Sequence, residues 1–182
     1  MKKDKLTIKA KKEGYLARSA YKLLELQRKY YLIKKNSRVL DLGCWPGGWL
    51  QVILGITPFV VGVDIKKTEV EHIETHVMNI LSDEIFSLGK FDVVLSDVAP
   101  HTTGDIKFDQ YKSLELSTRS FQIAQKLLKK NGNFLVKIFQ GPDSMKLLDK
   151  MKRRFRATRC IKPQASKQHS KEVYFLGLGF RD

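Results

Sequence analysis

A glycine-rich turn between an apolar segment and a helical segment is the feature that most constrains this fold. Residues 39–49 read Val-Leu-Asp-Leu-Gly-Cys-Trp-Pro-Gly-Gly-Trp. Glycine lets a backbone pass close to a ligand, and the first turn of a helix offers unpaired N–H groups. The spacing is Gly-x-x-x-Gly-Gly rather than the Gly-x-Gly-x-x-Gly that holds a pyrophosphate. It therefore favours a nucleoside cofactor without a diphosphate, S-adenosylmethionine, over a nicotinamide dinucleotide; an ordinary strand-to-helix turn is the alternative.

Apolar segments rich in β-branched residues predict seven strands. They cover residues 38–42, 59–65, 76–79, 91–96, 133–139, 156–161 and 173–180. Several are continuously apolar, as expected for strands that are buried on both faces of a mostly parallel sheet. No helical pattern separates the last two, which predicts an antiparallel hairpin at one sheet edge, joined by loop 162–171.

Helical patterns lie between these strands. They cover residues 17–30 and 109–130, and a further helix follows Gly141-Pro142-Asp143 and runs to about Arg154. The long helix is expected to stop at Asn131-Gly132, a typical C-terminal signal. The chain is thus predicted to be a doubly wound α/β fold with helices on both faces of the sheet, in a single domain over residues 1–182.

The net charge of +15 is unevenly distributed along the chain. Residues 1–38 contain 13 Lys or Arg and 3 Asp or Glu, and residues 126–171 contain 14 and 2. Residues 39–125 contain 6 and 12. Two basic ends around an acidic middle are typical of a polyanion-binding protein, and we expect nucleic acid. An anionic membrane is the weaker alternative, because no segment combines a basic face with a continuous lipid-facing apolar face.

Other sequence features limit the class of protein. No apolar run approaches the roughly 20 residues needed to cross a bilayer, and the N-terminus lacks the apolar stretch of a secretory signal. The two cysteines, Cys44 and Cys160, have no His or Cys at metal-ligand spacing. We expect a cytoplasmic protein with reduced thiols and no metal site.

Polar residues at the ends of successive strands predict a cofactor site. Asp41, Asp64 and Asn79 end the first three strands. A carboxylate after the second strand is well placed to accept both ribose hydroxyl protons of a nucleoside, and Asn79 could bond an adenine edge. Trp49 either packs into the core or contacts the cofactor, and its place directly after Gly48 favours a contact through its backbone.

Charged residues predict a catalytic group beside the cofactor. Asp97 follows the fourth strand, and Lys137 lies within the otherwise apolar fifth strand. A buried ammonium group needs a carboxylate partner or a depressed pKa, and Asp97, one strand away, is the natural partner. Lys22 and Glu172 fit the same pocket, which completes a Lys-Asp-Lys-Glu set.

Several short motifs follow one another along the chain. They are Lys12-Glu13-Gly14-Tyr15, Arg18-Ser19-Ala20-Tyr21-Lys22-Leu23, Asp41-Leu42-Gly43, Pro46-Gly47-Gly48-Trp49, Ser96-Asp97-Val98-Ala99-Pro100, Val136-Lys137-Ile138-Phe139-Gln140-Gly141 and Ser170-Lys171-Glu172-Val173-Tyr174. With these motifs in this order, the chain resembles the FtsJ-type RNA ribose 2′-O-methyltransferases over nearly its whole length. The resemblance implies a Rossmann-like S-adenosylmethionine-dependent methyltransferase fold. It also implies a catalytic tetrad of Lys22, Asp97, Lys137 and Glu172, and cofactor contacts by Gly47, Trp49, Asp64 and Asp97.

Three positions depart from the family pattern. Trp45 stands where the family has a small residue, and Asn79 stands where it has aspartate. His101 follows Pro100 where the family tends to have asparagine. An asparagine still accepts and donates hydrogen bonds, so cofactor binding is expected to be retained with altered affinity.

The resemblance implies 2′-O-methylation of a uridine ribose in large-subunit ribosomal RNA within the ribosomal subunit, by a monomer that does not bind DNA. Residues 1–36, with the basic arm Lys2–Lys12, are expected to contribute to RNA binding and catalysis. Alternatives are a ribose methyltransferase acting on tRNA, or less favoured on an mRNA cap, and a non-catalytic RNA-binding ribosome-assembly factor. The complete Lys-Asp-Lys-Glu set argues against the last of these.

Overall fold

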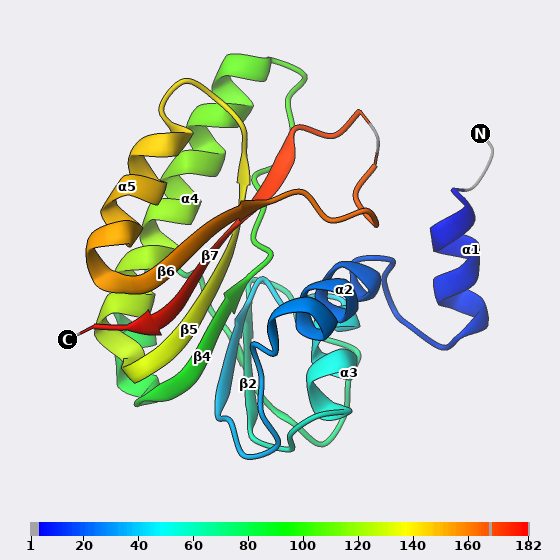
Figure 1. Ribbon diagram of the computed structural model, residues 1–182. Coiled ribbons are helices and arrows are strands. Elements are labelled where there is room, and N and C mark those ends of the chain that lie inside the picture. The colour runs from blue at the N-terminus through cyan, green and yellow to red at the C-terminus, as the bar shows by residue number, and fades with distance from the viewer. Residues whose placement is uncertain (1–3, 168, 182) are drawn as a thin grey trace.

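The computed structural model describes residues 4–167 and 169–181 and contains a seven-stranded sheet with helices on both faces (Figure 1). The strands are β1 (Val39–Leu42), β2 (Val60–Asp64), β3 (Glu74–Val77), β4 (Phe91–Ser96), β5 (Leu128–Phe139), β6 (Phe155–Ile161) and β7 (Glu172–Phe180). The helices are α1 (Lys5–Lys12), α2 (Ala20–Tyr30), α3 (Gly48–Leu54), the 3₁₀ helix η1 (Asp83–Leu88), α4 (Ile106–Leu127) and α5 (Ser144–Arg154).

The strand order is β3-β2-β1-β4-β5-β7-β6. Strand β7 pairs antiparallel with both β5 and β6, and the remaining neighbours pair in parallel. The predicted Rossmann-like fold and the antiparallel hairpin at the sheet edge are therefore confirmed, with β6 as the outermost strand.

Two hydrophobic clusters cover the two faces of the sheet. Alternate residues of a strand point to opposite faces. In β5, Phe134, Val136 and Ile138 belong to the cluster that contains α4 and α5, whereas Leu135 belongs to the cluster that contains α2 and α3. Lys137, two residues after Leu135, therefore lies on the α2 face of the sheet.

The boundary between α4 and β5 differs from the prediction. The helix begins at Ile106, because the Asp105 side chain accepts hydrogen bonds from the backbone N–H groups of Lys107 and Phe108. It ends at Leu127 rather than at Asn131-Gly132, because Leu128 already pairs with β4. The Asn131-Gly132 pair forms an irregularity within β5, where Asn131 adopts a left-handed backbone conformation (φ 66°).

Three other elements also differ from the prediction. The helix α2 begins three residues later than expected, and β3 covers residues 74–77 rather than 76–79. The expected basic arm forms helix α1 after the N-cap Asp4; the first residues of that arm, through Lys3, lie outside the described part of the chain. Within residues 4–167 and 169–181, none of the helices has the length and apolar character needed to cross a membrane.

Candidate active site

A cavity of about 520 Å³ opens at the carboxyl ends of the parallel strands. The chain order reverses between β1 and β4, and ligands of open α/β sheets bind at such a switch point. The cavity is lined by Gly43, Trp45, Asp64, Ile65, Lys66, Met78, Asn79, Ile80, Leu81, Asp97, Val98, Ala99, Pro100, His101, Leu116 and Lys137. The structure thus brings the predicted residues Asp64, Asn79, Asp97 and Lys137 to one cavity.

Asp64 and Asn79 are held by backbone hydrogen bonds. The two carboxylate oxygens of Asp64 accept from the N–H groups of Trp45 and Lys66, each at 3.0 Å. The side-chain oxygen of Asn79 accepts from the Leu81 N–H at 2.9 Å. The carboxylate of Asp64 can still accept hydrogen bonds from a ligand, because each oxygen has a second lone pair. Asn79 presents its amide NH₂ group as a hydrogen-bond donor.

Gly47 and Trp49, predicted as cofactor contacts, do not line this cavity. Gly47 has φ +130°, and a Cβ there would collide with Val70 and Leu16. The Trp49 side chain is 3% exposed, and its indole N–H donates to the Ser19 carbonyl at 2.9 Å. The indole therefore packs into the core, which was one of the two alternatives; contact of the Trp49 backbone with a cofactor stays a prediction.

Asp41 is buried just behind the cavity. Its side chain is fully buried, and neither carboxylate oxygen has a hydrogen-bond partner within residues 4–167 and 169–181. Burial raises the pKa of Asp41 well above its ordinary value, and the nearby carboxylates of Asp97 and Asp64 raise it further. Three acidic groups therefore meet at the carboxyl end of the sheet.

Lys137 and Asp97 form the predicted ion pair. Lys137 Nζ lies 3.1 Å from Asp97 Oδ1 and also donates to the Asp97 backbone carbonyl at 2.6 Å. The Lys137 residue is 8% exposed, so the pair is largely shielded from water. This confirms that a carboxylate partner compensates the buried ammonium group.

Lys22 and Glu172 form a second ion pair on the same face of the sheet. The Lys22 side chain is 10% exposed, and its ammonium group contacts Glu172 Oε1. The Ser166 hydroxyl donates to the same oxygen at 2.8 Å. The second half of the predicted set is thus assembled from α2, the β6–β7 loop and the start of β7. Contrary to the prediction, neither Lys22 nor Glu172 lines the cavity that contains Asp97 and Lys137, because their ion pair lies beyond Tyr174.

Tyr174 connects the two ion pairs and is the residue whose role the sequence did not reveal. Its hydroxyl donates to Asp97 Oδ1 at 2.6 Å, and Lys22 Nζ lies 5.8 Å from its ring centroid. Burial raises the pKa of the Tyr174 hydroxyl well above 10, and Asp97 and Glu172 raise it further. Tyr174 stands in an apolar run, and only its register opposite Lys137 reveals the connection.

Two residues that depart from the family pattern lie at the cavity. Trp45 is 46% exposed, and Lys66 Nζ lies 4.4 Å from its ring centroid. His101 lies on the exposed loop that follows Pro100. Both contribute to the rim of the cavity rather than to its ion pairs.

Comparison with known proteins identifies close relatives. Residues 15–180 match the family described as FtsJ-like methyltransferase. The chain is 41% identical to the ribosomal RNA large subunit methyltransferase E of Archaeoglobus fulgidus, over 95% of this chain and 94% of the relative. The protein of the same name from Syntrophobacter fumaroxidans is also 41% identical, over 95% and 93%. A solved ribosomal RNA methyltransferase of Plasmodium falciparum matches with a TM-score of 0.80 and 29% identity, over 91% of this chain and 98% of that chain.

Proposed function

This chain belongs to the FtsJ-like methyltransferase family, and on that premise we propose that it transfers a methyl group from S-adenosylmethionine to the 2′-hydroxyl of a ribose in large-subunit ribosomal RNA, at a uridine. The names of the two curated relatives support the class of RNA. The observation that carries the proposed chemistry is the Lys137–Asp97 pair at the wall of the cavity, which Tyr174 joins to Lys22 and Glu172.

The residues around the cavity fit S-adenosylmethionine in charge and in hydrogen bonding. Asp64 and Asp97 place negative charge at the cavity, which suits a cofactor with a sulfonium and an ammonium group. In our proposal Asp64 binds the ribose hydroxyls, Asn79 the adenine and Asp97 the amino-acid end, and the turn at Gly47 and Trp49 makes backbone contacts. When bound, this cofactor supplies a methyl group on an excellent leaving group.

The tetrad residues would align the ribose and handle its proton. Lys137 would steer the 2′-hydroxyl into position or, as its uncharged amine, take the proton that leaves this hydroxyl when the oxygen binds the methyl carbon, and Asp97 would keep Lys137 in place. Lys22 binds the hydroxyl or an adjacent phosphate, and Glu172 holds Lys22. Alignment of two reactants contributes roughly 7–11 kcal/mol in ideal cases, and a positioned base about 10²–10⁴-fold in rate.

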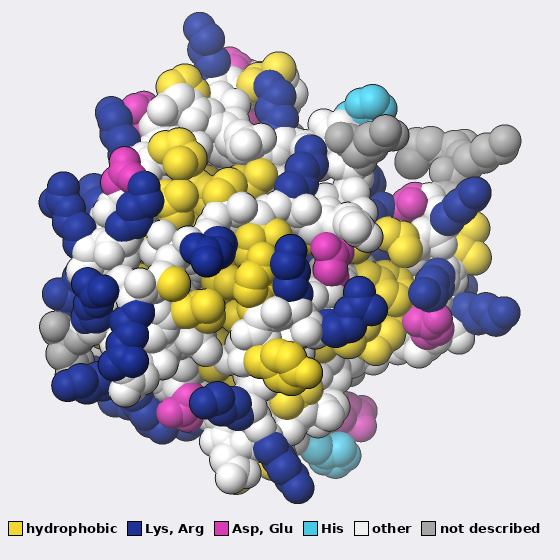
Figure 2. Space-filling view, viewed as in Figure 1, with side chains coloured by type: hydrophobic (Ala, Val, Ile, Leu, Met, Phe, Trp, Pro, Cys, Tyr) yellow, Lys and Arg dark blue, Asp and Glu magenta, His cyan; other side chains and the backbone are white. Residues whose placement is uncertain are grey.

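Basic side chains on several elements would bind RNA phosphates. The last turn of α1 contains Lys9, Lys11 and Lys12, and that of α5 contains Lys152, Arg153 and Arg154. Figure 2 shows Lys and Arg side chains over much of this face of the molecule, most densely on the left, where α5 and β6 lie in Figure 1. Phosphate contacts position an RNA without reading its sequence, so the shape of the RNA would select the target.

The test is transfer of labelled methyl groups from S-adenosylmethionine to undermodified large ribosomal subunits, free ribosomal RNA and tRNA. We expect label at one ribose of subunit RNA, in a linkage that resists alkaline cleavage because the 2′-oxygen is blocked. Lys137→Ala should lower the rate at least about 10²-fold and leave cofactor affinity within about twofold. Lys129→Ala is the matched control, because Lys129 also lies on β5 and pairs with an aspartate, Asp92, at 3.0 Å.

Other outcomes would change the proposal in defined ways. Label on tRNA alone would make this chain a tRNA ribose methyltransferase. Cofactor binding without transfer to any RNA would favour a binding role in ribosome assembly. Loss of cofactor binding in Lys137→Ala would assign Lys137 to the architecture of the cavity rather than to catalysis.

A further inference from the structure

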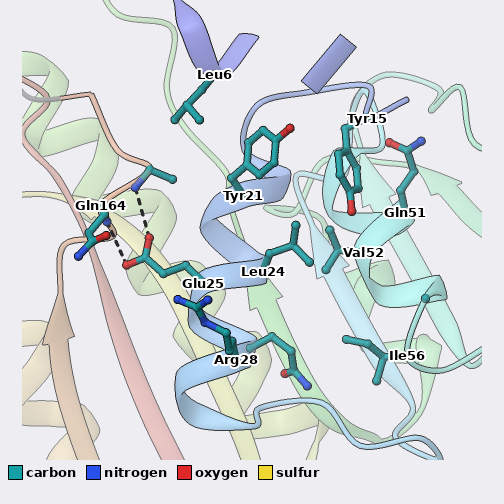
Figure 3. Close-up of a pocket in the computed structure, with 13 residues that line it drawn as sticks. Leu6, Tyr15, Tyr21, Leu24, Glu25, Arg28, Gln51, Val52, Ile56 and Gln164 are labelled. Carbon is teal, nitrogen blue, oxygen red and sulfur yellow. Dashed lines mark hydrogen bonds between the residues drawn. The ribbon is translucent and has the colours of Figure 1, made fainter. Parts of the chain in front are cut away.

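A second, larger cavity of about 710 Å³ lies beside the catalytic residues and is not used by the proposed chemistry. It is lined by residues of α1, α2, α3 and the β6–β7 loop (Figure 3). Pockets that bind small ligands have volumes of about 300–1,000 Å³. Its apolar and aromatic lining comes from Leu6, Tyr15, Tyr21, Leu24, Val52 and Ile56.

The lining combines aromatic rings with a cationic rim. The rings of Tyr15 and Tyr21 lie edge to face, with centroids 5.7 Å apart. Figure 3 shows Arg28 at the end of the cavity beside Glu25, with Leu24 between them and the tyrosines. Aromatic rings and guanidinium planes are the groups on which proteins stack unpaired RNA bases.

Two of the helices that line this cavity end with basic residues, whereas the lining itself contains Arg28 and the carboxylate of Glu25. The α1 helix, which supplies Leu6, ends with Lys9, Lys11 and Lys12. The last turn of α2 contains Arg28 and Lys29. Figure 2 shows hydrophobic side chains between basic ones on the right, where α1 and α2 lie in Figure 1. An apolar pocket with such a rim fits a base whose phosphates lie outside the pocket.

The cavity shares two structural elements with the tetrad. Tyr21 lines the cavity, and the next residue of α2, Lys22, pairs with Glu172. In the β6–β7 loop, the backbone N–H groups of Gln164 and Ala165 donate to Glu25 at 3.0 and 3.3 Å (Figure 3). The next loop residue, Ser166, donates to Glu172. A nucleotide in this cavity would therefore lie close to the nucleotide being methylated.

We propose that this cavity receives an unstacked base of the RNA substrate, close to the target nucleotide, and stacks it against Tyr21 and Leu24 with Arg28 at its edge. The inference rests on the proposed function, because it takes RNA as the substrate. The pocket would select RNA in which a base near the target is free to leave its stack, which is a shape requirement that phosphate contacts alone do not impose.

The experiment fills the cavity and measures RNA recognition. Leu24→Trp places a bulky ring in the cavity, and Leu54→Trp is the matched control, because both leucines are 36% exposed and only Leu24 lines the cavity. We expect Leu24→Trp to raise KM for undermodified large subunits about tenfold, the loss of one stacked base, with kcat within about twofold. Arg28→Ala should raise KM in the same direction, whereas Lys90→Ala, which changes an exposed lysine before the amino end of β4, should not.

A second readout locates the base directly. Ribosomal RNA that contains 4-thiouridine should form photocrosslinks within residues 15–28 of the wild-type protein, and Leu24→Trp should remove them. The proposal is overturned if Leu24→Trp and Leu54→Trp have the same KM and the same crosslinks while the wild type methylates RNA. If the wild type methylates no RNA, the proposed function fails, and crosslinks that Leu24→Trp removes would still support the base pocket.

Discussion

Asp41 is a buried ionisable group for which the described part of the fold provides no hydrogen-bond partner. Its carboxyl group is fully buried, and its two oxygens have no hydrogen-bond partner in the described part of the chain. An ionised carboxylate in such a place is strongly unfavourable, so burial favours the protonated form of this group.

We predict that Asp41→Asn raises the free energy of unfolding of the cofactor-free protein at pH 8 and changes it little at pH 4. The pKa of Asp41 is raised in the folded chain, so the folded state retains a proton that the unfolded state has lost. The free energy of unfolding of the wild type is therefore highest at low pH. It falls by up to about 1.4 kcal/mol per pH unit as the pH rises above the ordinary pKa of an aspartic acid side chain. Urea unfolding at several pH values measures the difference.

Asp92→Asn is the control with the opposite sign. Burial raises the pKa of Asp92, but the Arg38 backbone N–H and Lys129 lower it overall. This carboxylate stabilises the fold above its ordinary pKa, so the substitution should reduce stability at pH 8. Equal pH profiles for wild type and Asp41→Asn would contradict the assignment of a buried, uncompensated carboxyl group.

We propose that Tyr174 acts through Asp97, as a positioning residue. We predict that Tyr174→Phe lowers kcat about tenfold, because it removes the hydroxyl that donates to Asp97 and leaves the ring beside Lys22. Cofactor affinity should stay within about twofold. The loss should be constant between pH 6 and pH 9, because the raised pKa keeps the wild-type hydroxyl protonated there. Tyr30→Phe is the matched control; an unchanged kcat in Tyr174→Phe would show that the ion pairs hold their geometry without it.

Helix α1 shows how a short element depends on the rest of the molecule. It has eight residues, and helices of this length are marginal in isolation. Ala10 is its buried residue, and Leu6 contributes to the second cavity. These contacts hold α1 against the body of the protein while its lysine side chains stay exposed.

We predict that replacing Lys5, Lys11 and Lys12 by Gln weakens RNA binding and leaves cofactor binding unchanged. Each lost phosphate contact should reduce the magnitude of the slope of log K against log salt concentration by about 1. The slope of the triple variant should therefore be smaller in magnitude than that of the wild type by up to about 3. Titration of RNA at several salt concentrations gives the slope.

The control for α1 uses lysines at the opposite end of the sheet. Lys90, Lys126 and Lys130 are exposed near the amino ends of β4 and β5, away from the cavities. Their replacement by Gln should leave the salt slope close to the wild-type value. Identical slopes in both triple variants would show that RNA binding does not use α1.

At the scale of the whole molecule, α2 contributes both to the Lys22–Glu172 ion pair and to the second cavity. The cavity proposed to bind the cofactor opens at the switch point between β1 and β4, and the second cavity is lined by α1, α2, α3 and the β6–β7 loop. Lys22 reaches the tetrad from this helix, whereas Tyr21 and Leu24 face the second cavity. One helix thus connects the proposed chemistry with the proposed recognition of RNA.

The strands were predictable because strands of a sheet that is buried on both faces are continuous apolar runs in the sequence. Element boundaries were less predictable. Asn131-Gly132 is a typical helix C-terminal signal when the local sequence is considered alone. Leu128, however, pairs with β4, so the strand begins there and the helix ends earlier. That Asp64 and Asn79 share one cavity was predictable because they follow strands whose carboxyl ends must meet, whereas Gly47 and Trp49 do not line this cavity.

The sequence by itself determined the fold class, the family and the chemical types of the site residues, including the Asp97 partner of Lys137. Only the tertiary structure decided that the Trp49 indole is buried, that Asp41 has no partner, and that Tyr174 joins two ion pairs. It also decided that α1, α2, α3 and the β6–β7 loop line a second cavity. The physical reason is that periodicity and turn chemistry act over a few residues, whereas these features depend on strand register and on contacts between segments that are far apart in the chain.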